Sequence, residues 1–78
     1  MLKNKPTLII TFATTTQAMA MEKFCAQQGL PGRLIPVPRE ITAGCGLSWK
    51  AQPEDKDRLI TALTDAEMKW AECHILEV

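Results

Sequence analysis

The first part of the chain changes its hydrophobic period within a few residues. In residues 7–12 the apolar Leu8, Ile10 and Phe12 alternate with a second set made of Thr7, Ile9 and Thr11, and the many β-branched residues there predict a strand. The apolar positions that follow repeat with helical spacing and predict a helix over Thr15–Gln28. Its start has the capping-box pattern Thr14-x-x-Gln17, and Gly29 is a suitable stop.

The second part of the chain predicts two strands around a loop, followed by a helix and a last strand. Residues 33–38 form the second strand, residues 39–46 the loop, and Leu47–Ala51 the third strand. An apolar stripe with a proline at its beginning predicts a helix over residues 53–66. The segment 70–78 closes the chain as a fourth strand.

Two prolines decide where the second strand lies. Pro36 and Pro38 have no N–H to donate, so this strand belongs at a sheet edge. The order β-α-β-β-α-β, with short connections and right-handed crossovers, then favours a sheet order of 4-1-3-2 with both helices on one face. We therefore predict one ferredoxin-like α+β domain over residues 1–78.

The balance of charges and the length of the apolar runs argue against two classes of partner. Nine Lys and Arg balance nine Asp and Glu, so the chain lacks the positive charge typical of nucleic-acid binding. The longest uninterrupted apolar run covers only residues 18–21, far too few for a membrane span. We expect no nucleic-acid partner and no membrane partner.

The three cysteines have no CxxC spacing. An odd count without that spacing argues against a disulfide framework and against a structural zinc site. We expect free thiols in a reducing cytoplasm, with no metal and no cofactor.

One of the three thiols differs from the others in its surroundings. Cys25 and Cys73 fall at apolar positions of a helix and a strand, where a cysteine is usually a small, inert hydrophobic residue. Cys45 lies between Gly44 and Gly46 in the predicted loop, where neither neighbour has a side chain to cover the sulfur. We expect Cys45 to be exposed and the other two thiols to be mostly buried.

The predicted topology brings the start of the first helix to the same end of the sheet as Cys45. That start carries three hydroxyl side chains, those of Thr14, Thr15 and Thr16. A helix N-terminus stabilises a thiolate and lowers its pKa. Arg39 of the same loop adds positive charge, while Glu40 opposes it.

The segment from Leu34 to Leu47, which reads LIPVPREITAGCGL, resembles the signature of a bacterial family of selenium/sulfur carrier-like proteins. The resemblance extends over nearly the whole chain and implies that Cys45 bears the sulfur or selenium. Cys25 and Cys73 are not part of that signature. The resemblance also implies a supporting loop made of Pro38, Arg39, Glu40, Gly44 and Gly46.

The leading hypothesis is a carrier, rather than an enzyme in the ordinary sense, that relays sulfur or selenium on Cys45 from a donor protein to an acceptor protein. One alternative is a non-catalytic module that docks a partner or a small anion through residues 38–45. Another is a redox-sensing thiol that forms a mixed disulfide. The sequence leaves open the choice between sulfur and selenium, the identity of the partners and the oligomeric state.

Overall fold

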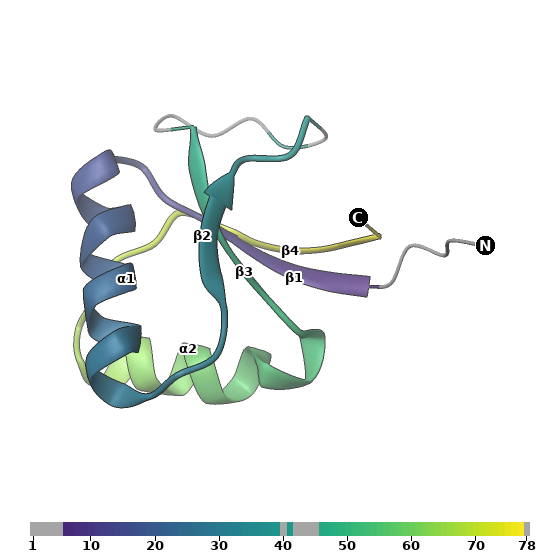
Figure 1. Cartoon of the computed structure of the whole chain (residues 1–78). Coiled ribbons are helices and arrows are strands. Elements are labelled where there is room, and N and C mark those ends of the chain that lie inside the picture. Colours follow the sequence, from purple (N-terminus) through teal and green to yellow (C-terminus); the bar gives the residue numbers. More distant parts are fainter. Residues whose placement is uncertain (1–5, 40, 42–45, 78) are drawn as a thin grey trace.

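A four-stranded antiparallel sheet forms the centre of the fold. The computed structural model describes residues 6–39, 41 and 46–77. The strands are β1 (Pro6–Thr11), β2 (Arg33–Pro36), β3 (Leu47–Ala51) and β4 (Cys73–Glu77). Their order across the sheet is β2-β3-β1-β4 (Figure 1). This is the predicted order read from the other edge, and it is consistent with the ferredoxin-like arrangement expected from the sequence.

The first helix, α1 (Thr15–Gln28), has the bounds that its pattern predicts. The Thr14 hydroxyl accepts a hydrogen bond from the Gln17 N–H at 3.1 Å, and the Gln17 side chain reaches back to accept one from the Ala13 N–H at 3.0 Å. Gly29 ends the helix in the left-handed conformation, with φ of 66°. Local capping chemistry therefore fixes both ends of α1.

The second helix begins later than expected. Residues 53–55 form a 3₁₀ turn, η1 (Pro53–Asp55), and the α-helix α2 covers Lys56–Asp65. The Asp55 N–H donates to the Gln52 carbonyl at 2.9 Å, the tight bond that makes this turn 3₁₀. Among the helices of the described residues, none is long and apolar enough to cross a membrane.

Two strands are shorter than their patterns predict. β2 ends at Pro36 instead of residue 38. Proline has no N–H, so Val37 is the only residue among 36–38 that can donate a main-chain hydrogen bond. β4 begins at Cys73 instead of residue 70. Two main-chain hydrogen bonds still hold the preceding residues beside β1. The Ala71 N–H donates to the Thr11 carbonyl at 2.8 Å, and the Thr11 N–H donates to the Glu72 carbonyl at 2.8 Å.

The core lies between one face of the sheet and both helices. Leu8 pairs with Ala51, and Ile10 pairs with Trp49, so these four side chains share one face. The same buried cluster includes three residues of α1 and two of α2, namely Ala18, Met21, Cys25, Leu59 and Leu63. Both helices therefore cover the same face of the sheet, as predicted.

Candidate functional site

The segment between β2 and β3 is closed at its base by a main-chain bond. The Val37 N–H donates to the Gly46 carbonyl at 3.0 Å, which joins the two ends of residues 37–46. Inside the segment, the Ile41 N–H donates to the Pro38 carbonyl at 3.0 Å, and Ile41 is only 7% exposed. The described part of the segment therefore has a closed base, a turn and a buried side chain.

Three residues of the predicted supporting loop lie in the described part of the chain. Pro38 is half-buried, while Arg39 and Gly46 are exposed. Gly46 has φ of 75°, a left-handed conformation that favours glycine, and a β-carbon there would meet nothing within 4 Å. Cys45 and the remaining loop residues, Glu40 and Gly44, lie outside the described residues.

The start of α1 lies at the same end of the sheet as the base of this loop. Thr11, which precedes α1, pairs with Ser48, which follows Gly46 by two residues. The helix has no acidic residue in its first turn, so its positive partial charge is not offset there. Thr14, Thr15 and Thr16 are exposed at this end. The predicted proximity of this helix start to Cys45 itself falls outside the described residues.

Comparison with known proteins identifies the family. Residues 7–75 match the family described as "Putative Se/S carrier protein-like". The chain belongs to this family. No curated protein and no solved structure shows significant similarity to the chain. The matched residues extend from β1 into β4 and include the whole segment between β2 and β3.

The two thiols outside this segment, Cys25 and Cys73, differ from each other in burial. Cys25 is 1% exposed and its Sγ donates to the Met21 Sδ at 3.8 Å, so its predicted burial is confirmed. Cys73 is only half-buried, because it lies on the edge strand β4. Burial raises the pKa of the Cys73 thiol, while the charge of Lys56 and a hydrogen bond from Trp70 lower it.

Burial of the Cys25 thiol predicts a loss of stability at alkaline pH. Burial raises the pKa of Cys25 from its ordinary value of 9.0 to about 11. The unfolded chain therefore loses this proton first, and the free energy of unfolding falls as the pH rises from about 9 to 11. We expect this group to remove up to about 2–3 kcal/mol over that range.

The measurement is urea unfolding at a series of pH values, with Cys25→Ala as the control. The variant loses about 1 kcal/mol at neutral pH, because it is a small truncation in the core. Its alkaline slope should be shallower than that of the wild-type protein, since lysine titration is common to both. Parallel pH profiles for the two proteins would contradict the assignment.

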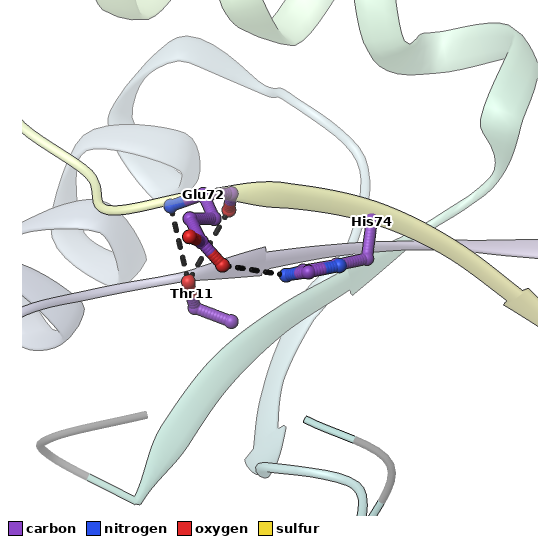
Figure 2. Close-up of polar contacts among 3 residues, drawn as sticks. All are labelled: Thr11, Glu72 and His74. Atoms are coloured by element: carbon purple, nitrogen blue, oxygen red, sulfur yellow. Dashed lines mark hydrogen bonds and ion pairs between the residues drawn. The ribbon is translucent and has the colours of Figure 1, made fainter. Parts of the chain in front are cut away.

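A polar cluster on the other face of the sheet was not predicted from the sequence. The His74 Nε2 lies 2.9 Å from a carboxylate oxygen of Glu72, and the Glu72 N–H donates to the Thr11 hydroxyl at 3.1 Å (Figure 2). Cys73, the residue between them, packs towards the helical core. Consecutive strand residues point to opposite faces, so His74 is not placed to act as a base for Cys73.

Proposed function

We propose that this protein carries sulfur or selenium as a persulfide or perselenide on Cys45. The observation that carries the proposal is the family match, which spans the segment between β2 and β3. Cys45 is the one thiol of that segment, and both of its neighbours are glycines. Neither Cys25 nor Cys73 fits this role as well, because burial disfavours the thiolate that the chemistry needs.

The transfer conserves atoms and electrons. The Cys45 thiolate attacks the outer sulfur of a donor persulfide, the donor S–S bond breaks, and the donor sulfur leaves as a thiolate. Cys45 then holds the transferred sulfur as Cys45–S–SH, and an acceptor thiolate or enzyme removes it by the same kind of step. A selenium atom follows the same course. The protein is thus a carrier used by a donor and an acceptor, and it requires no cofactor of its own.

The loop and the helix start supply what a reactive thiolate needs. Gly44 and Gly46 have no side chain that could cover a neighbouring sulfur, and Gly46 has the left-handed conformation that favours glycine. Arg39 is exposed and contributes a positive charge in the same loop. The start of α1, at residues 14–16, contributes partial positive charge at the same end of the sheet. Pro38 and Glu40 complete the supporting loop, and the reducing cytoplasm keeps the unloaded thiol free.

The test is the intact mass of the protein after incubation with inorganic polysulfide, before and after treatment with a reductant. A gain of one sulfur atom that the reductant removes supports the carrier. If the protein takes up no sulfur from polysulfide but forms a glutathione or sulfenic acid adduct when treated with an oxidant, Cys45 is a redox-sensing thiol. No adduct under either condition contradicts the carrier and leaves the docking module as the better description.

A further inference from the structure

We propose that the face of β2 and β3 opposite the helices docks an acidic segment of the donor protein through Arg33 and Lys50. This inference rests on the proposed function, because a carrier has to receive its cargo from a partner. It adds the place on the surface where that partner binds and the charge of the segment that binds there.

The register of the sheet puts the two cations side by side. Arg33 of β2 pairs with Lys50 of β3 in the antiparallel ladder. Their neighbours Leu34 and Trp49 pack into the core beneath the helices. Because successive side chains of a strand alternate between the two faces, Arg33 and Lys50 both project from the face that the helices leave uncovered.

Neither of these two charges takes part in an ion pair within the described part of the chain. Like charges directly opposite each other on neighbouring strands are destabilising. The ion pair found among the described residues joins His74 and Glu72 on β4, and neither Arg33 nor Lys50 takes part in it. β2 and β3 contain no acidic residue. In a chain of zero net charge, this pair of strands is a local concentration of positive charge.

The cations lie on the two strands that lead into and out of the loop bearing Cys45. Arg33 lies three positions before Pro36, and Lys50 lies three positions after Leu47, so each cation is about 10 Å along its strand from the loop. A donor that delivers sulfur to Cys45 approaches over these strands, where an acidic segment would be attracted to both side chains.

A groove beside the two cations offers space for such a segment. It has a volume of about 1120 Å³, and residues of β2, β3, β1 and η1 line it, including both Arg33 and Lys50. Arg33 is exposed and Lys50 half-buried. The η1 side of the groove carries Glu54 and Asp55. Those carboxylates repel an acidic segment, so we place its contact on the sheet side of the groove.

The experiment compares sulfur transfer from two peptides that end in a cysteine persulfide, one with a run of glutamates and the other with a run of serines. At low salt we expect transfer to the protein to be about tenfold faster from the glutamate peptide. Added salt should remove this advantage, because it screens exposed charges. The double variant Arg33→Glu/Lys50→Glu should abolish the advantage and leave transfer from the serine peptide unchanged.

A matched variant controls for net charge. Lys23→Glu/Lys69→Glu reverses two exposed lysines elsewhere on the surface and should retain the advantage. An equal loss in both double variants would overturn the proposal. Faster transfer from a third peptide, with a run of lysines, would also overturn the proposal, because it would mean that Glu54 and Asp55 dominate the groove. If Arg33→Glu/Lys50→Glu does not fold, Arg33→Gln/Lys50→Gln removes the same two positive charges and should also abolish the advantage of the glutamate peptide.

A second readout separates failure of the docking surface from failure of the carrier function. If neither peptide transfers sulfur, the carrier function fails, and binding is then followed by NMR with a glutamate peptide that lacks the persulfide. Salt-sensitive amide shifts in β2 and β3 support the docking surface independently of Cys45. Their absence, or transfer at equal rates from both peptides, overturns it.

Discussion

Cys45→Ser should abolish the reducible gain of one sulfur atom on incubation with polysulfide. It should also remove most of the fast alkylation by iodoacetamide at neutral pH. The hydroxyl that replaces the thiol cannot form a persulfide, and the two remaining thiols react slowly because burial raises their pKa values. The measurement is intact mass for sulfur uptake and peptide mass for site-by-site labelling.

The matched controls are Cys25→Ala and Cys73→Ala. Both variants should still take up sulfur on Cys45, and each should cost about 1 kcal/mol of stability, as a small truncation of a buried or half-buried side chain. In the wild-type protein, labelling should be fastest at Cys45 and slowest at Cys25. Faster labelling of Cys25 or Cys73 than of Cys45, or sulfur uptake by Cys45→Ser, would mean that another thiol carries the cargo.

The parts of the fold that local chemistry determines could be predicted from the sequence. The bounds of α1 follow from the hydroxyl cap of Thr14 and the left-handed Gly29, both of which act within one turn of the helix. The sheet order follows from right-handed crossovers and short connections, and it agrees with the prolines of the second strand, which are tolerated at an edge. β3 also has its predicted bounds.

The parts that depend on distant residues could not be predicted. The start of β4 is decided by which backbone groups face β1, and a hydrophobic pattern does not reveal that pairing. The contact between Thr11 and Glu72 joins residues 61 positions apart. The cationic pair of Arg33 and Lys50 is likewise visible only after the register of β2 and β3 is known.

The candidate site also has one part that could be predicted from the sequence and one part that could not. Cys45 stands out in the sequence because two glycines flank it, and the family match covers its loop. The closure of that loop by Val37 and Gly46 is a cross-strand bond, which only the structure reveals. The chemistry proposed for the thiol therefore rests on local sequence, whereas the docking surface proposed for the donor depends on how two strands pair.

Gly32 is a second feature that only the structure reveals, since nothing in the sequence distinguishes it from an ordinary turn glycine. Its φ is 112°, and a β-carbon there would collide with the Trp49 indole and lie 2.5 Å from the Lys50 carbonyl oxygen. Trp49 is 3% exposed, and its indole N–H donates to the Pro31 carbonyl at 3.0 Å. The indole cannot withdraw without losing that bond and disturbing the core.

Gly32→Ala should therefore destabilise the protein by about 3 kcal/mol, the sum of a backbone cost and an overpacking cost. Gly29→Ala is the matched control, because Gly29 also has a positive φ but nothing within 4 Å of its β-carbon. It should lose only the backbone part, about 1 kcal/mol. Urea unfolding measures both losses, and equal losses would show that the clash with Trp49 is absent.

Trp49→Phe in the Gly32→Ala background provides the decisive comparison. A smaller ring relieves the collision, so the double variant should lose less stability than the sum of the two single variants.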